Sequence, residues 1–89
     1  MHTYIAGSPY HPGSKERVPK LLLEEELKLV REKDNAHDRN AVAVHDSAGL
    51  KLGYVPRTDA PTVAKVMDLG IPTCVFSRGS TNIMIYWEA

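Results

Sequence analysis

The chain has 89 residues, of which 43% are hydrophobic and 25% are charged. This length predicts one domain with a modest core, and the composition is too apolar for a disordered chain. The 11 basic and 11 acidic residues cancel. That balance argues against a protein that holds nucleic acid by bulk electrostatic attraction, but it leaves room for a local basic patch.

Cys74 is the single cysteine, so neither a disulfide nor a cysteine-zinc site is expected within one chain. It falls in a predicted strand with no neighbouring group to activate it, and we expect it to be buried and inert. No apolar stretch approaches the roughly 20 residues that span a bilayer. The N-terminus lacks the charged and apolar regions of a signal peptide, so we expect a cytoplasmic protein with no membrane partner.

The first third of the sequence predicts two strands that are separated by an irregular loop and a short helical turn. Residues 3–6 are mostly β-branched or aromatic and predict a strand. Residues 7–14 hold two glycines and two prolines, a density that predicts an irregular loop. A short helical turn is expected at about 15–22. A half-buried strand should follow over about 25–32, where leucines alternate with charged residues.

The middle of the chain predicts a hairpin. The small apolar run at 41–44 is typical of a strand that is buried on both faces. Residues 45–50 contain the turn formers Asp, Ser and Gly, and residues 51–55 predict the returning strand.

The clearest helix is expected at about 58–69. Thr58 or Asp59 is the predicted N-terminal cap, and Gly70 stands where a left-handed C-terminal cap belongs. Two last strands are predicted at about 72–78 and 82–88. Six short strands and one clear helix predict a mainly β fold, and closure into a small barrel would remove exposed strand edges.

The stretch "REKDNAHDRNAVAV" at 31–44 is the most unusual in the chain. From its residues alone it is a turn, a metal loop, a catalytic cluster or a loop that reads a ligand. A calcium loop is disfavoured because the D-x-[DN]-x-[DN]-G spacing is missing, and a zinc site because no close His/Cys pair occurs. Catalysis is disfavoured because no nucleophile stands beside an oriented base, so we expect neither an enzyme nor a bound cofactor or metal.

The stretch "LVREKDNAHDRNAVAV", followed by "GLKLGYVPRTDA", resembles the HIRAN domain family. The resemblance extends more loosely over residues 3–88, so the chain looks like a single free-standing HIRAN domain at 1–89. The residues that match the family's pattern are Leu29, Arg31, Glu32, Asn35, His37, Asp38, Asn40, Ala41, Val42, Val44, Gly53, Tyr54, Val55, Pro56, Arg57 and Ala60.

The resemblance implies a six-stranded barrel similar to an OB-fold, with helical insertions. In larger fork-remodelling enzymes that carry it, the domain binds the 3′ end of single-stranded DNA. We therefore expect a module that binds single-stranded DNA, prefers free 3′-hydroxyl ends and serves DNA repair or replication-fork processing. The alternative is a protein-interaction module without DNA affinity, which self-associates through an exposed strand such as 82–88.

By resemblance, Asp38 occupies the position that contacts the strand end, and Asn35 is a second position of the same site. A carboxylate repels phosphate but accepts a hydrogen bond from a terminal hydroxyl, so it distinguishes an end from an interior. For both residues the alternative is a turn role within the loop. Asn40 is expected to tie down the loop backbone.

His37 stands where many family members have tyrosine, and Tyr10 and Tyr54 are the other candidates for stacking on bases. Arg57 matches a basic position of the family and is the first choice for a phosphate contact. Arg31, Lys33, Arg39 and Lys51 are further candidates on the same face, with solvated surface charge as the alternative. The sequence departs from the DNA-end binders at Pro9, where they carry an arginine, and this predicts weak phosphate binding.

Overall fold

The computed structural model describes residues 1–88, apart from the side chain of Pro9. One sheet of six antiparallel strands has the spatial order β1-β6-β5-β2-β3-β4. The predicted mainly β fold with six short strands is confirmed. The strands are β1 (His2–Tyr4), β2 (Glu26–Arg31), β3 (Val42–Asp46), β4 (Lys51–Tyr54), β5 (Thr73–Ser77) and β6 (Asn82–Trp87).

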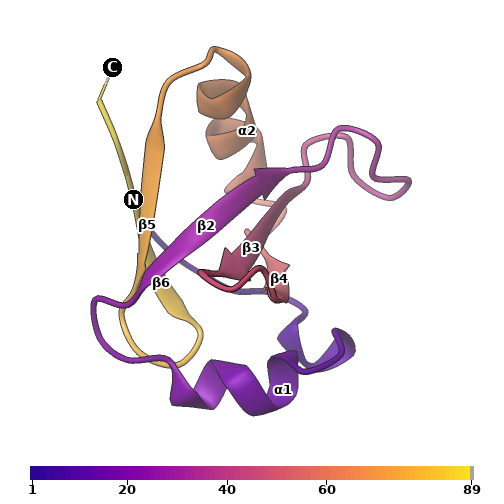
Figure 1. Ribbon diagram of the computed structural model, residues 1–89. Helices are drawn as coiled ribbons and strands as arrows, with labels where there is room; N and C mark the ends of the chain where they lie inside the picture. The colour runs from indigo at the N-terminus through magenta and orange to yellow at the C-terminus, as the bar shows by residue number, and fades with distance from the viewer. Residues whose placement is uncertain (89) are drawn as a thin grey trace.

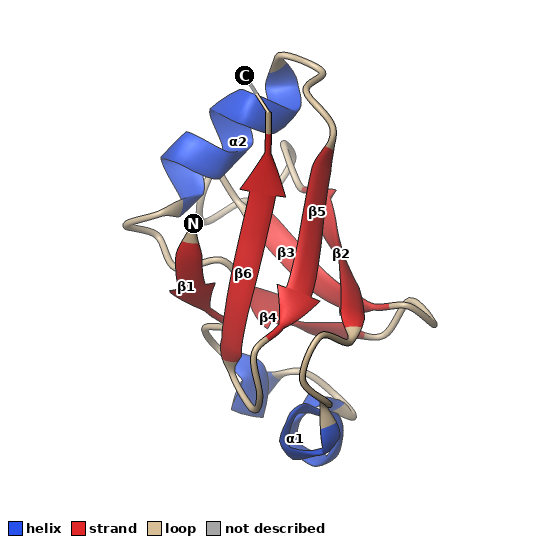
Figure 2. Cartoon of the chain, turned by 90° about the vertical axis from the view of Figure 1, so that its left-hand side faces the viewer, coloured by secondary structure: helices blue, strands red, loops and turns tan. Residues whose placement is uncertain are grey.

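Helices cover the two ends of the curled sheet. α2 (Ala60–Asp68) lies across one end, and α1 (Ser14–Arg17) lies at the other (Figure 1, Figure 2). The predicted helical turn is α1 followed by the 3-10 turn η2 (Val18–Lys20). The prediction that nothing regular forms at 7–14 is wrong, because a 3-10 turn, η1 (Ser8–Tyr10), forms there, and the fixed φ of the proline at its second position suits a first turn.

The barrel is closed at one point, between the segment after β1 and the end of β4. The Ala6 N–H donates to the Tyr54 carbonyl at 2.7 Å, and the Tyr54 N–H donates to the Ala6 carbonyl at 2.9 Å. Gly53 permits this approach. A Cβ at Gly53 would lie 2.4 Å from the Ala6 carbonyl oxygen and 2.6 Å from Ile5 Cγ2.

Strand alternation places the core inside this barrel. Leu27 is buried between the exposed Glu26 and Lys28, as the period-two pattern predicted. The run at 41–44 is buried throughout, which confirms a strand covered on both faces. The largest fully buried apolar side chains come from five elements: Leu52, Ile83, Ile85, Val42, Val44, Val63 and Val75.

The same alternation corrects the expectation for Cys74, which is exposed rather than buried. Its neighbour Val75 is 1% exposed and points into the core, so successive side chains on β5 face opposite sides of the sheet. Cys74 therefore points outward, opposite Tyr86 of β6.

β6 lies inside the sheet, paired with β1 on one side and β5 on the other. It therefore offers no free edge, and the predicted self-association through an exposed strand at 82–88 loses its premise. None of the helices in the described residues is long and apolar enough to cross a membrane.

The two ends of α2 differ in how well the sequence predicted them. Gly70 has φ +78°, so the predicted left-handed cap is confirmed. Asp59 is the N-terminal cap residue, but its side chain makes no cap hydrogen bond. Its carboxylate instead accepts a hydrogen bond from the Thr3 hydroxyl at 2.6 Å, which ties the start of α2 to β1.

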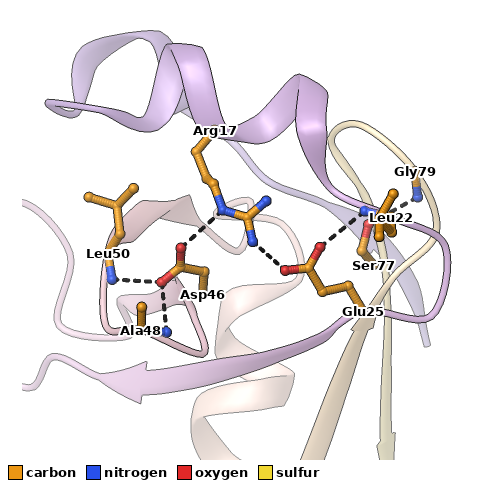
Figure 3. A network of polar contacts seen from close by, with 8 residues as sticks. All are labelled: Arg17, Leu22, Glu25, Asp46, Ala48, Leu50, Ser77 and Gly79. Atoms are coloured by element: carbon orange, nitrogen blue, oxygen red, sulfur yellow. Dashed lines mark hydrogen bonds and ion pairs between the residues drawn. The ribbon is translucent and has the colours of Figure 1, made fainter.

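Arg17 ties α1 to two parts of the sheet (Figure 3). Its guanidinium donates to Asp46 Oδ2 at 3.2 Å and to Glu25 Oε2. Asp46 is 5% exposed, and its Oδ1 also accepts from two backbone N–H groups of the β3–β4 turn. Burial raises the pKa of Asp46, but hydrogen bonds from the turn and from Arg17 outweigh it and hold the pKa below its usual value. A backbone hydrogen bond from Leu22, reinforced by Arg17, lowers the pKa of Glu25.

Replacing Gly53 with alanine should open the barrel closure. We expect Gly53→Ala to lower the free energy of unfolding by about 2–4 kcal/mol, because the new Cβ must displace backbone rather than a flexible side chain. Gly49→Ala is the control for backbone strain alone, since Gly49 has φ +94° with no atom within 4 Å of an added Cβ. Gly49→Ala should lower the free energy of unfolding by about 1 kcal/mol. Urea unfolding measures both, and equal losses would show that the close approach does not require glycine.

Arg17→Met should lower the free energy of unfolding by about 1–2 kcal/mol at pH 7. Both partner carboxyls have lowered pKa values, so their contribution is present above the unfolded pKa of about 4 and is lost as the pH falls through the folded values. The difference in the free energy of unfolding between wild type and Arg17→Met should therefore be smaller at pH 3 than at pH 7. Lys15→Met, an exposed change on the same helix, is the control, and a gap independent of pH would contradict the ion-pair account.

Candidate functional site

A pocket of about 400 Å³ opens beside the point where the barrel closes. Its volume lies in the range of small-molecule and nucleotide pockets. Three segments build its walls: the chain after β1, the loop between β2 and β3, and the end of β4. Five of the six predicted site residues line it, namely Asn35, His37, Asp38, Tyr54 and Arg57.

Tyr10, the sixth, does not line the pocket and is 87% exposed. It ends η1, which carries its side chain out into solvent. His11, the next residue, takes the place in the pocket wall that was expected for Tyr10. Pro9, the departure from the family's arginine, has a side chain outside the described part of the structure.

Five lining residues were not predicted, namely Ala6, Gly7, His11, Ala41 and Val55. His11 is the informative one, because its ring lies 5.4 Å from the Tyr54 ring, centroid to centroid, at a tilt of 56°. Its place in the same Gly/Pro-rich loop as Tyr10 was the available signal. Ala41 and Val55 belong to the family's pattern but were not singled out as site residues. Ala6 and Gly7 enter the site through the barrel closure.

The loop at 33–41 is folded by two consecutive side-chain turns. Asn35 Oδ1 accepts from the His37 N–H at 2.9 Å and from the Asp38 N–H at 3.1 Å. Asp38 Oδ1 accepts from the Asn40 N–H at 2.9 Å. These are the turn roles that the sequence left open for both residues. Among the described residues, Asp38 Oδ2 has no hydrogen-bond partner, and Asp38 lines the pocket.

Tyr54 is fixed by its hydroxyl group. The hydroxyl donates to Glu32 Oε1 at 2.8 Å and accepts from Lys51 Nζ at 3.1 Å. Lys51 also lies 5.1 Å from the centre of the Tyr54 ring. The ring is thus anchored at its hydroxyl and packs against the imidazole of His11, with Lys51 Nζ over the ring.

Arg57 is exposed and donates through Nη2 to the His37 carbonyl at 2.9 Å. This contact joins the end of β4 to the loop and leaves the other guanidinium donors of Arg57 available. Three further basic candidates are paired with carboxylates: Arg31 and Lys33 with Asp68, and Lys51 with Glu32. Among the described residues, Arg57 is the basic side chain that lines the pocket.

The site therefore combines aromatic rings, one free carboxylate oxygen and one guanidinium in a mainly apolar wall. Within residues 1–88, no group of three or more His, Cys, Asp or Glu side chains is placed to hold a metal ion. The arrangement can stack on a flat ring, accept a hydrogen bond from a hydroxyl and pair with an anion.

Two solved structures share the fold of this chain. The crystal structure of a protein from Lactobacillus plantarum superposes with a TM-score of 0.89 at 23% identity, over 97% of this chain and 89% of that chain. The HIRAN domain of human HLTF superposes with a TM-score of 0.80 at 18% identity, over 98% of this chain and 73% of that chain. No curated protein matches. The HIRAN domain model matches residues 1–85, and with the OB-like barrel also confirmed, the chain belongs to the HIRAN domain family.

Proposed function

We propose that this chain binds single-stranded DNA in the pocket and prefers a strand that ends in a free 3′-hydroxyl group. The observation that carries the proposal is that Asp38, whose Oδ2 has no hydrogen-bond partner among the described residues, lines the same pocket as Arg57. A carboxylate at this place accepts a hydrogen bond from a hydroxyl and repels a phosphate. Arg57 provides the opposite charge for the phosphate that precedes the terminal nucleotide.

The rings provide the remaining affinity. Tyr54 and His11 form one wall, and His37 stands in the loop opposite. Stacking on an aromatic ring contributes roughly 1–3 kcal/mol per base and depends little on base identity. The expected ligand is therefore a strand end of any sequence.

In this proposal the chain is a binding module rather than an enzyme. Among the described residues that line the pocket, none is a serine, threonine, cysteine or lysine that would serve as a nucleophile. A role in DNA repair or at replication forks follows from recognition of strand ends, because those processes create and consume 3′ ends.

Asp38→Asn tests the end preference. The amide oxygen of Asn keeps the hydrogen bond to the Asn40 N–H, while its NH₂ group donates where Oδ2 would accept. We expect affinity for a 3′-hydroxyl oligonucleotide to fall about tenfold or more and to converge on that for a 3′-phosphate oligonucleotide. Fluorescence anisotropy at about 50 mM salt measures both, with a closed hairpin as a third ligand.

Asp34→Asn is the matched control, since it makes the same charge change at an exposed position of the same loop outside the pocket. It should leave the preference intact. Equal wild-type binding to all three ligands would replace end recognition with a generic groove. No binding to any of them would refute the DNA function.

The salt dependence of binding tests the charge balance of the site. One phosphate contact, from Arg57 in the pocket lining, predicts a log–log slope of about −0.7 for a single strand. Arg57→Gln should make the slope about 0.7 shallower, because one contact is lost. Arg39→Gln, an exposed change in the same loop that does not line the pocket, should not change it. A wild-type slope steeper than about −5 would contradict the proposed site.

A further inference from the structure

Glu32 lies where two walls of the pocket meet, although it does not line the pocket itself. It follows β2 directly and precedes the loop. Its Oε1 accepts hydrogen bonds from the Tyr54 hydroxyl at 2.8 Å and from Asn35 Nδ2 at 3.2 Å. Its Oε2 pairs with Lys51 Nζ at 2.7 Å. One carboxylate therefore contacts both the aromatic wall and the loop.

The contact with Asn35 extends to the residues that would read the strand end. A carboxylate accepts but does not donate, so it turns the Asn35 amide with its NH₂ group toward Glu32 and its oxygen toward the loop. That oxygen holds the backbone N–H groups of His37 and Asp38. The place of the Asp38 side chain thus depends on Glu32 through Asn35.

The contact with Tyr54 fixes the ring in the opposite wall. The Tyr54 hydroxyl lies between Glu32 and Lys51, so the ring is held from both sides at its outer end. A tyrosine held at its hydroxyl presents its face to a base without first losing rotational freedom. The same carboxylate therefore sets the geometry of both walls.

The charge of Glu32 is retained and balanced in place. Burial raises the pKa of Glu32, but hydrogen bonds from Lys51, Tyr54 and Asn35 outweigh it and leave the pKa below its usual value. The hydrogen bond to Glu32 is the main cause of the raised pKa of Lys51. Lys51 thus offsets a negative charge that would otherwise oppose a nearby phosphate.

We propose that Glu32 is the positioning residue of this site, which couples the aromatic wall to the end-reading loop without contacting DNA. The expected effect of Glu32 on DNA binding rests on the proposed function. The expected effect of Glu32 on the order of the loop rests on the hydrogen bonds alone. The competing account is that Glu32 only forms a stabilising ion pair with Lys51.

Two matched variants separate these accounts. Glu32→Ala removes all three contacts of Glu32. Lys51→Met removes the ion pair and the Lys51–Tyr54 hydrogen bond, and it leaves Glu32 Oε1 to hold Tyr54 and Asn35. Glu32→Ala should weaken binding of a 3′-hydroxyl oligonucleotide about five- to tenfold and reduce its preference over the 3′-phosphate form. Lys51→Met should keep the preference. Glu26→Ala, an exposed change on the same β2 strand, should change neither.

Amide hydrogen exchange tests the loop without DNA. In Glu32→Ala the His37 and Asp38 amides should exchange about tenfold faster, because Asn35 is no longer held. The amides of the β2–β3 ladder should keep their wild-type rates, which separates a local effect from a general loss of stability.

Each outcome bears on one proposal. Faster loop exchange together with a reduced end preference supports the positioning role. Faster loop exchange in a chain whose wild type binds no DNA refutes the proposed function and leaves Glu32 as a loop anchor. Unchanged loop exchange and unchanged preference in Glu32→Ala, or equal losses of preference in Glu32→Ala and Lys51→Met, overturn the inference.

Discussion

The pocket depends on the close approach of two backbones at Gly53. The pair of hydrogen bonds between Ala6 and Tyr54 joins the first and last strands of the sheet order, and only a residue without a Cβ fits there. This contact brings the segment after β1, with Gly7 and His11, against the end of β4. Without it, Tyr54 would stand at an open sheet edge and the pocket would lack one wall. The barrel closure thus removes an exposed edge and forms the pocket at the same time.

Several of the charged side chains form ion pairs that join separate elements of the fold. Arg17 binds Glu25 and Asp46, Arg31 binds Asp68, and Lys51 binds Glu32. The formal net charge of zero reflects equal numbers of acidic and basic residues. Within the described part of the chain, Arg57 is the basic side chain that lines the pocket, which leaves few basic groups there for phosphates. A protein that tracks along a strand needs a continuous basic groove. A protein that recognises one terminal nucleotide needs a small, shaped site, and the charge distribution of this chain favours the second kind.

Much of this architecture could be predicted from the sequence, because strand alternation and turn residues are local signals. The strand alternation at Leu27, the doubly buried run at 41–44 and the cap at Gly70 were read correctly. Cys74 was wrongly predicted to be buried, because the usual burial of cysteine was given more weight than the strand alternation. That alternation places Cys74 on the face opposite to its buried neighbour Val75. In the site, the loop residues were found through the family's motif. His11 was missed, because its position follows from η1 and the barrel closure, which join residues more than 40 positions apart in the chain.

The turn role of Asp38 is compatible with the binding role that we propose for it. One carboxylate oxygen holds the Asn40 N–H, and the other is unpartnered among the described residues. The turn fixes the direction of the carboxylate, and this fixed direction is what an acceptor needs in order to distinguish a hydroxyl from a phosphate. Asn35 serves the loop in the same way, with its own orientation set by Glu32. In the function that we propose, a loop built from short polar side chains obtains its rigidity and its specificity from the same hydrogen bonds. This would account for the concentration of Asn and Asp in so few positions.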